Sequence, residues 1–438
     1  MSRWAAGLEA LSQSHVWTRG EILAFQTRRL RAVVRHTARR VPYYRRLFAE
    51  AGVRPEDIRT LDDLGRIPVT SRFDLQRLPA REATSEDLKP DRLALHTTSG
   101  TSGEPLRILR TVFEEYLLRA FRLKQQLLMG MRPTDRGWGI GGTGRPSSME
   151  RVPGSRVLTR RLGFQATYAA NWSMPTEAVL NQFRQAQPDA LVGSASALAW
   201  LAGLMTPEDR VRSRPRYIKT SGETCTAEMR RQLTETFGVP VHDEYASHEF
   251  NLIASECPQG GRYHIQEWNL ILEVLDGDRP VRTGEEGEVV ATGLHSFAMP
   301  FIRYRLNDLV ILGGNPCPCG APVTTLDRIL GRTIERFLLP DGRQVHPYVL
   351  VRPLLAGAPW LRRYQIVQDR PDHILVKLVP MSEPGPDAVA SVARSVTAAL
   401  DARVEVDAVL LEDIPPEPNG KYRAYYSLVS EQAQGRGA

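Results

Sequence analysis

A run of small and hydroxyl-bearing residues at 97–105, Thr-Thr-Ser-Gly-Thr-Ser-Gly-Glu-Pro, has the composition of a phosphate-binding loop. Small residues let the backbone approach a polyphosphate closely, and amide and hydroxyl donors can surround its oxygens. The run is not a Walker P-loop, because that motif requires a lysine directly after its last glycine, where Glu104 stands. Taken alone, such a run is more often a plain flexible turn, so its interpretation depends on the segments that follow.

Three cysteines and a histidine form a second group with possible chemistry. Cys257 and His264 lie in Cys-Pro-Gln-Gly-Gly-Arg-Tyr-His, and Cys317 and Cys319 lie in a later Cys-Pro-Cys-Gly. Three thiolates and one imidazole would complete a tetrahedral structural zinc site. The alternative is a set of reduced cysteines without metal, with His264 packed on a strand. The sequence favours zinc, and Cys225 is predicted to be a buried thiol.

Further motifs follow the run at 97–105 in a fixed order. They are Tyr245-Ala246-Ser247-His248-Glu249, Tyr304-Arg305-Leu306-Asn307-Asp308, Gly331-Arg332 and Pro418-Asn419-Gly420-Lys421. This order resembles the adenylate-forming superfamily, and residues 41–76 resemble its phenylacetate-coenzyme A ligase branch. The resemblance implies an ATP-dependent ligase that activates an aryl or other compact carboxylic acid as acyl-AMP, releases pyrophosphate and transfers the acyl group to coenzyme A.

The resemblance also implies a nucleotide site built from residues far apart in the sequence. It assigns to the ATP phosphates Thr98, Ser99, Gly100, Thr101, Ser102 and Gly103. It assigns to the adenine side Ser221, Gly222, Glu223 and Tyr245. Asp308 would accept hydrogen bonds from the ribose hydroxyls, a task suited to a carboxylate with two acceptor oxygens. Gly331 and Arg332 would mark the hinge between two domains, and Arg332 is counted with the nucleotide-binding residues.

Charge neutralisation is the central problem of the implied reaction, because a carboxylate must attack the α-phosphorus of an anionic nucleotide. Magnesium bound by Glu249 and the ammonium group of Lys421 would stabilise charge on the phosphate oxygens. His248 is a candidate substrate contact or base, with a hydrogen-bonded wall residue as the alternative. Taken singly, Glu249 and Asp308 could be solvated surface acids and Lys421 a tail lysine. The ordered set favours the functional interpretation.

The sequence departs from the family pattern at several positions. Glu104 stands where a lysine is common, and Ala246 and His248 replace a glycine and a hydroxyl residue. At the hinge, Ile334 and Glu335 replace paired aspartates. The acceptor of the acyl group therefore stays open between coenzyme A and an amine, a carrier-protein thiol or a small inorganic nucleophile. A regulatory nucleotide-binding subunit without catalysis is a further alternative.

The acid is predicted to contact residues in loops after strand-like segments that flank these motifs. The candidates are Trp138, Gly141, Gly193, Ser194, Ser196 and Tyr245.

The pattern of the segments that carry these residues predicts an α/β fold. Short apolar runs at 190–196, 216–223 and 287–294 alternate with helix-length segments, which is typical of buried strands in a mixed domain. Beyond residue 331 the pattern changes to strands near 364–367, 374–378 and 404–412 and a helix that carries Val389, Val392, Val396 and Leu400. We expect a large adenylation domain at 1–331 and a small mobile α+β lid domain at 332–438 that carries Lys421.

The composition is that of a globular protein, with 42% hydrophobic and 24% charged residues in 438. The formal net charge of +7 comes mainly from arginine. One dense run contains Arg28, Arg29, Arg31, Arg35, Arg39, Arg40, Arg45 and Arg46. A nucleic-acid surface is one interpretation, but we favour a helix that packs Leu30, Val33 and Val34 and solvates its arginines.

The N-terminal segment lacks the apolar run of a secretory signal, and no run reaches transmembrane length. We therefore expect a cytoplasmic enzyme with no nucleic-acid or membrane partner, and a homodimer stays open.

Overall fold

The computed structural model describes residues 3–97, 106–132, 134–141, 167–171, 174–315, 317–332, 337–345, 350, 354, 358, 360–380, 382–400, 403–414 and 425–429. The chain divides into two compact units. Unit 1 comprises Met1–Leu306 and Val310–Ile329, and unit 2 comprises Asn307–Leu309 and Leu330–Ala438. Among the described residues, no helix has the length and apolar character needed to span a membrane.

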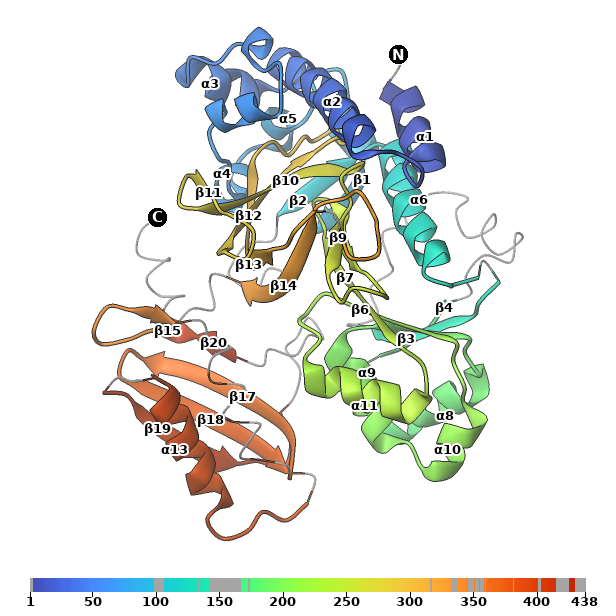
Figure 1. The fold of residues 1–438 in the computed structure, drawn as a ribbon, viewed down its shortest axis with the longest axis vertical. Coiled ribbons are helices and arrows are strands. Elements are labelled where there is room, and N and C mark those ends of the chain that lie inside the picture. The colour runs from blue at the N-terminus through green and yellow to red at the C-terminus, as the bar shows by residue number, and fades with distance from the viewer. Residues whose placement is uncertain are drawn as a thin grey trace. The chain divides into compact units, whose positions relative to one another are not determined.

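A 12-stranded sheet runs through the first unit in the order β11-β10-β12-β13-β14-β9-β8-β7-β6-β5-β3-β4. Its parallel part consists of β4 (Thr167–Asn171), β3 (Gly137–Gly141), β5 (Ala190–Gly193), β6 (Tyr217–Ser221) and β7 (Val241–Ser247). The helices beside these strands are α8 (Thr176–Ala186), α9 (Ala195–Leu204), α10 (Pro207–Arg212) and α11 (Ala227–Phe237) (Figure 1). Buried side chains from both layers form one apolar cluster, as a parallel sheet requires.

The rest of the sheet is largely antiparallel. It comprises β8 (Asn251–Glu256), β9 (Tyr263–Ile265), β10 (Leu270–Asp276), β11 (Arg279–Pro280), β12 (Glu286–Gly293), β13 (Tyr304–Leu312) and β14 (Thr325–Arg332). A separate hairpin pairs β1 (Ala94–Thr97) with β2 (Arg107–Arg110), which flank the glycine-rich run, and β2 leads into α6 (Val112–Leu128). The mixed α/β fold expected from the alternating apolar runs is confirmed.

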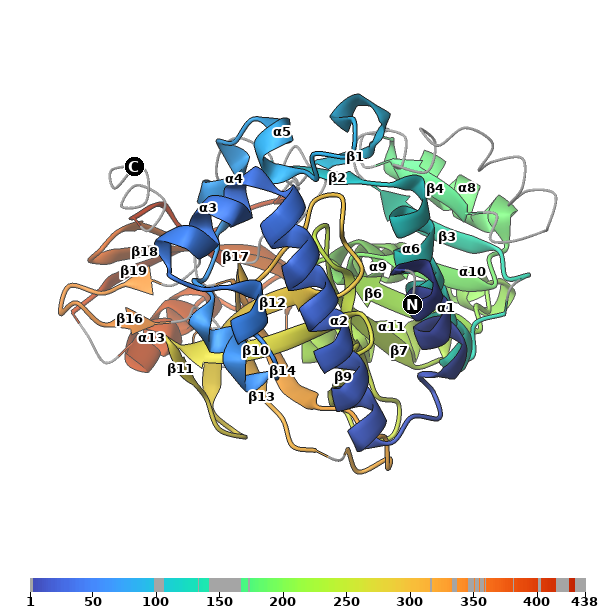
Figure 2. The ribbon, with the colours of Figure 1, turned by 90° about the horizontal axis from the view of Figure 1, so that it is seen from above.

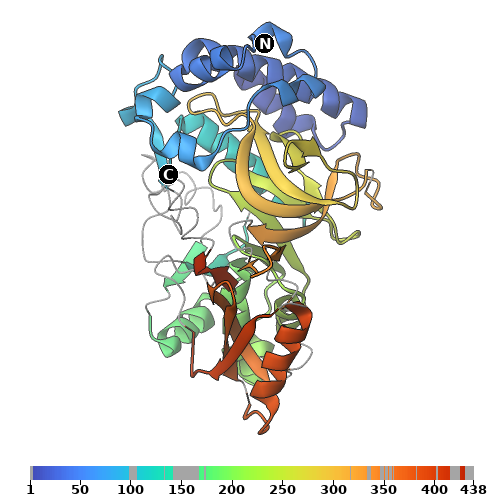
Figure 3. The ribbon, with the colours of Figure 1, turned by 90° about the vertical axis from the view of Figure 1, so that its left-hand side faces the viewer.

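Helices near the N-terminus gather at one end of the first unit, beside the antiparallel strands (Figure 3). They are α1 (Arg3–Gln13), α2 (Arg19–Arg40), α3 (Pro42–Glu50), α4 (Arg72–Gln76) and α5 (Ala80–Ala83), with short 3-10 turns at Pro55–Asp57, Asp62–Arg66 and Pro90–Arg92. A Thr18–Glu21 capping box starts α2, and Pro42 begins α3 where its missing amide is tolerated. Gln26 of α2 donates to the Leu270 carbonyl at 3.0 Å, which fixes the helix against β10 (Figure 2).

The arginine run lies on α2 and α3, whose other side is apolar. Leu30, Val33 and Val34 are fully buried in the core. Exposed arginines form ion pairs within the same unit, namely Arg28 with Glu9, Arg45 with Glu86 and Arg46 with Glu82. Arg29 is an exception to the expected solvation, because it is 4% exposed and donates to the Leu294 carbonyl. The run is therefore the polar side of an amphipathic pair of helices.

The second unit has a four-stranded sheet in the order β19-β18-β17-β20. Its elements are β17 (Leu361–Arg370), β18 (His373–Pro380), α13 (Ala388–Leu400), β19 (Glu405–Leu410) and β20 (Tyr425–Ser427), with a small hairpin of β15 (Phe337–Leu338) and β16 (Gln344–Val345). Val392, Val396 and Leu400 bury one face of α13 against this sheet. The helix and strands expected in this part of the sequence are present.

His373 lies between two acidic side chains of the second unit and hydrogen-bonds to both. These bonds make the stability of the second unit depend on pH. Its Nδ1 lies 2.5 Å from Asp369 and its Nε2 lies 3.2 Å from Asp407. The bond to Asp369, then that to Asp407, raises the pKa of His373, although burial and Arg370 oppose the shift. The stabilisation is therefore complete below the unfolded pKa of about 6.5 and is lost as the pH rises through the folded value.

His373→Gln is expected to lower the free energy of unfolding more near pH 5 than near pH 9, on either side of the ordinary pKa of about 6.5. Urea denaturation of both proteins at the two pH values measures this. An equal loss at both would contradict a charged His373.

Candidate functional site

The parallel strands bring several predicted site residues to one edge of the sheet. Gly141, Gly193 and Ser221 are the last residues of β3, β5 and β6. Glu244 of β7 is the register partner of Ser221, so Tyr245 lies one residue beyond that edge. In open α/β sheets, ligands bind outside the carboxyl ends of the strands. The predicted acid and adenine residues therefore share the position where such folds bind ligands.

A hydrogen bond joins a predicted acid contact to the predicted adenine motif. Ser194 precedes α9 as its N-cap, and the Ser196 amide in the first turn donates to Glu223 Oε1. Gly222 between Ser221 and Glu223 has φ of 89°, a left-handed conformation that glycine adopts without strain. This turn directs Glu223 back towards α9.

Trp138 lies apart from that edge. It is fully buried near the start of β3, beside Leu191 in the sheet register. Its ring packs edge-on against Phe183 at a centroid distance of 5.1 Å. These contacts place the indole in the core between the strands and their helices.

Behind Ser221 lies a buried charged cluster that the sequence did not suggest. Arg122 of α6 donates to Glu244 at 2.7 Å and to the Ser221 hydroxyl at 3.2 Å. Lys219 Nζ lies 3.4 Å from the same carboxylate, and burial lowers its pKa to about 8. Gln126 donates to the other oxygen of Glu244 at 3.1 Å. The cluster ties α6 to β6 and β7 and fixes the Ser221 hydroxyl.

Glu249 lies in the turn at 248–250 that joins β7 to β8. The Phe250 amide donates to Ser247 Oγ at 3.2 Å, and Asn251 closes the turn with φ of 61°. A left-handed residue after a short turn is typical of three-residue hairpin loops. Glu249 is 7% exposed, so it is not a solvated surface acid.

Tyr304 of the Tyr-Arg-Leu-Asn-Asp motif contacts this carboxylate. Its hydroxyl donates to Glu249 Oε1 at 3.1 Å. Burial, with the charge of Glu249 next, raises the pKa of Tyr304 well above its ordinary value. The phenol therefore stays protonated and remains a donor. Two of the predicted motifs thus meet at Glu249.

For the remaining predicted site residues, the structure gives only the position in the chain fold and the burial, or does not describe them. His248 is exposed, which suits a residue that contacts ligand, and Asp308 is half-buried in β13 directly after Asn307, whose φ is 59°. Arg332 ends β14. The predicted phosphate-binding residues 98–103 and the predicted catalytic Lys421 lie outside the described residues.

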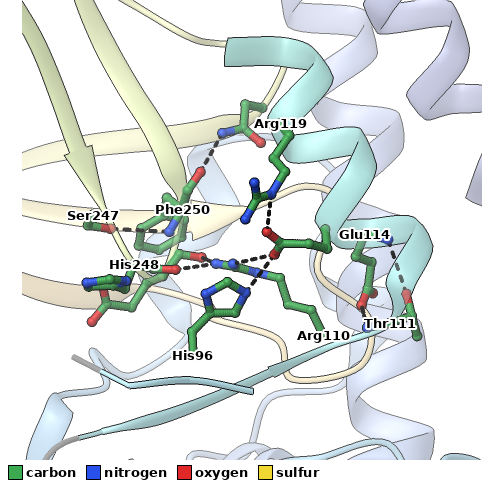
Figure 4. Close-up of polar contacts among 11 residues, drawn as sticks. His96, Arg110, Thr111, Glu114, Arg119, Ser247, His248 and Phe250 are labelled. Atoms are coloured by element: carbon green, nitrogen blue, oxygen red, sulfur yellow. Dashed lines mark hydrogen bonds and ion pairs between the residues drawn. The ribbon is translucent and has the colours of Figure 1, made fainter. Parts of the chain in front are cut away.

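The turn at 248–250 is held by Arg110, the last residue of β2, which the sequence did not single out. Its Nη2 donates to the carbonyl of His248 and, at 3.0 Å, to the carbonyl of Glu249 (Figure 4). Its Nη1 lies 3.3 Å from Glu115. The only local signal is the Thr111–Glu114 capping box that starts α6 directly after Arg110.

The buried carboxylate of Glu115 contacts three side chains that are cationic or donate hydrogen bonds. His96 Nε2 lies 2.7 Å from Glu115 Oε2, beside Arg110, and Arg119 donates to Oε1. Burial alone would raise the pKa of Glu115, but the His96 bond and the Arg110 charge hold it well below the usual value. The carboxylate therefore stays ionised at neutral pH.

The four predicted zinc ligands come together in the first unit. The ligand atoms of Cys257, His264, Cys317 and Cys319 all lie within 4.8 Å of one another. Zn–S bonds of about 2.3 Å separate tetrahedral ligands by about 3.8 Å, so the arrangement fits one zinc ion. His264 sits in β9 between Ser255 of β8 and Thr325 of β14.

Glycines make the close approach of the thiols possible. A Cβ on Gly260 would lie 3.0 Å from Cys317 Sγ and 3.7 Å from Cys257 Sγ, so any larger residue would crowd the cluster. Gly320, with φ of 85°, closes the second cysteine turn by donating to the Cys317 carbonyl at 2.8 Å. The tight Cys-x-Cys spacing is therefore compatible with a shared metal.

Comparison with solved structures gives the same fold. A crystal structure of 2-hydroxyisobutyryl-CoA ligase in the postadenylation state, with 2-HIB-AMP, matches with a TM-score of 0.78 and 21% identity over 95% of this chain and 92% of that one. An anthranilate-CoA ligase with anthranoyl-AMP matches with a TM-score of 0.55 and 16% identity, covering 78% and 66%. Residues 337–427 match the family model of the CapK C-terminal domain.

Sequence relatives are more informative about the family. The chain is 30% identical over 377 residues to the phenylacetate-coenzyme A ligase of Thermus thermophilus, covering 80% of this chain and 79% of the relative. It is 28% identical over 371 residues to the Escherichia coli enzyme of the same name, covering 81% and 80%. The chain therefore belongs to the phenylacetate-coenzyme A ligase family of adenylate-forming enzymes.

Proposed function

We propose that this chain activates a compact, preferably aryl, carboxylic acid with ATP as its acyl-AMP and then transfers the acyl group to coenzyme A. The observation that carries the proposal is the buried Glu249 carboxylate, held by Tyr304 beside the ligand-binding edge of the sheet. Membership of a family named for acid-CoA ligation supports the same reaction.

In this proposal, Tyr304 donates to one oxygen of Glu249, and the carboxylate would hold Mg²⁺ through the other, Oε2. The ion would supply positive charge beside the phosphates for the attack of the substrate carboxylate on the α-phosphorus and the departure of pyrophosphate. Asp308 holds the ribose, and Lys421 supplies a second cation. The acid lies among the residues at the strand ends, which include Gly141 and Gly193.

An exchange of labelled pyrophosphate into ATP, screened over aromatic, aliphatic and amino acids, tests the proposal. We expect exchange with aryl or other compact acids and, on adding coenzyme A, formation of the thioester. Hydroxylamine in place of coenzyme A reports acyl-AMP whatever the natural acceptor. Absence of acid-dependent exchange across the panel would overturn the proposed adenylation.

We further propose that Cys257, His264, Cys317 and Cys319 hold a structural zinc ion. The donor set of three thiolates and one imidazole is typical of closed zinc sites, which have no position for substrate. The ion would join the β8–β9 connection to the loop before β14, two segments distant in sequence. Its contribution would be to folding rather than to the reaction.

Protein purified without chelator is expected to contain about one zinc per chain, the stoichiometry of a closed four-ligand site. The Cys319→Ser variant should bind zinc weakly or not at all and should have a lower Tm, while the activity of the remaining folded enzyme changes less. Cys225→Ser is the matched control, because Cys225 packs against a separate apolar cluster and should keep its zinc. Metal analysis and thermal denaturation measure both; metal-free wild-type protein would refute the site.

A further inference from the structure

We propose that Arg110 is a positioning residue for adenylation, because it fixes the turn at 248–250 in the conformation that presents Glu249 to the cation. The inference rests on the role proposed above for Glu249. As a positioning residue, Arg110 would not touch the reacting groups. It acts through the two backbone carbonyls that it holds, those of His248 and Glu249.

The chemistry of the Arg110 contacts favours a geometric role. Arg110 is 3% exposed, and burial lowers its pKa. Taking an ion pair out of water is costly, so a pair such as Arg110 and Glu115 is weak support for stability by itself. A planar guanidinium can bond one carboxylate and two consecutive carbonyls at fixed angles, which the single ammonium of lysine cannot reproduce.

Glu115 links Arg110 to the strand that leads into the glycine-rich run. It accepts a bond from His96, which lies in β1 two residues before Thr98. One carboxylate thus contacts both the strand entering the predicted phosphate loop and the arginine holding the predicted magnesium ligand. Phosphate and cation must be placed together for reaction, and a displacement of about 1 Å can cost about a hundredfold in rate.

The first turn of α6 gives this network a rigid base. Glu114, next to Glu115, completes the capping box with Thr111 and accepts backbone bonds from Phe297 at 2.6 Å and Ala298 at 3.0 Å. These backbone bonds therefore also hold the first turn of α6, which begins directly after Arg110 (Figure 4). Sites supported by such bonds hold their geometry more closely than sites on unsupported loops.

The test compares Arg110→Lys with Arg29→Lys. Arg29 is a matched control, since it is also buried and donates to a backbone carbonyl, that of Leu294 rather than those of His248 and Glu249. Both variants should lower Tm. Only Arg110→Lys should raise the Mg²⁺ concentration for half-maximal pyrophosphate exchange, by severalfold, and lower the saturated rate by roughly a hundredfold. The KM for the acid should change little.

Glu115→Gln keeps the size of the side chain and tests the same link if Arg110→Lys does not fold. It should shift the Mg²⁺ dependence in the same direction by a smaller factor. A wild-type Mg²⁺ dependence in the folded variants, or an equal shift in Arg29→Lys, would overturn the positioning role. Failure of the wild-type protein to exchange pyrophosphate would instead overturn the proposed function.

Discussion

Lys421→Ala is expected to slow acyl-AMP formation by several orders of magnitude while ATP binding changes little. If the ammonium stabilises charge during attack on the α-phosphorus, its loss removes a contact made mainly in the transition state. Pro418, Asn419 and Gly420 favour a turn that projects this lysine. Single-turnover formation of acyl-AMP, beside nucleotide binding measured directly, gives the two quantities.

The same variant should still transfer the acyl group when it is supplied with synthetic acyl-AMP. We propose that the small domain rotates about the predicted hinge at Gly331 and Arg332 and so withdraws Lys421 before the second step. Lys377→Ala is the matched control, because Lys377 is a lysine of the same unit that bonds Gln365 within its sheet. Equal loss of both half-reactions would indicate a folding role, and an unaffected first half-reaction would show that another cation assists adenylation.

Local sequence patterns were sufficient to predict helices and strands, because these elements depend mainly on residues close together in the sequence. The apolar spacing of Leu30, Val33 and Val34 predicts a helix, and Pro42 predicts a helix end beside it; α2 ends at Arg40 and α3 begins at Pro42. In the second unit, the turn at 370–372 separates β17 from β18 where the sequence predicted two strands. Such features follow from periodicity and from the conformational limits of proline.

The candidate site was predictable only in part, because its contacts join distant segments. Arg110 reaches carbonyls of His248 and Glu249, and backbone carbonyls carry no residue-specific signal. The sequence predicts Trp138 in a loop that contacts the acid, whereas Trp138 lies on β3 and packs in the core. Pattern reasoning identifies residue types, but only the register of the strands determines which face each side chain occupies.

The four ligands of the cysteine cluster, by contrast, could be predicted from the sequence. Thiols and an imidazole are few enough in this sequence that the four ligands could be selected by type, and the structure brings them together. The sequence did not reveal the role of Gly260, which lies against two of the sulfur atoms. Close approach of a backbone to a ligand cluster is a property of the fold, not of the local sequence.

Glu249→Gln is expected to lower acid-dependent pyrophosphate exchange by roughly two to three orders of magnitude, as for loss of a main electrostatic contact. The amide keeps an oxygen for the Tyr304 hydroxyl, so the turn should stay folded. A neutral amide coordinates a hard cation poorly, and raised Mg²⁺ should therefore restore part of the activity. Asp308→Asn should instead raise the KM for ATP and show no such rescue, because its proposed partners are ribose hydroxyls.

Tyr304→Phe separates the charge of Glu249 from its orientation. This variant removes the hydroxyl that donates to Oε1 but leaves the carboxylate, so its loss of activity should be much smaller than that of Glu249→Gln. Steady-state exchange over a range of Mg²⁺ concentrations distinguishes the variants. If Glu249→Gln retains wild-type exchange at every Mg²⁺ concentration, Glu249 does not bind the catalytic cation. If Tyr304→Phe is as impaired as Glu249→Gln, orientation of the carboxylate matters as much as its charge.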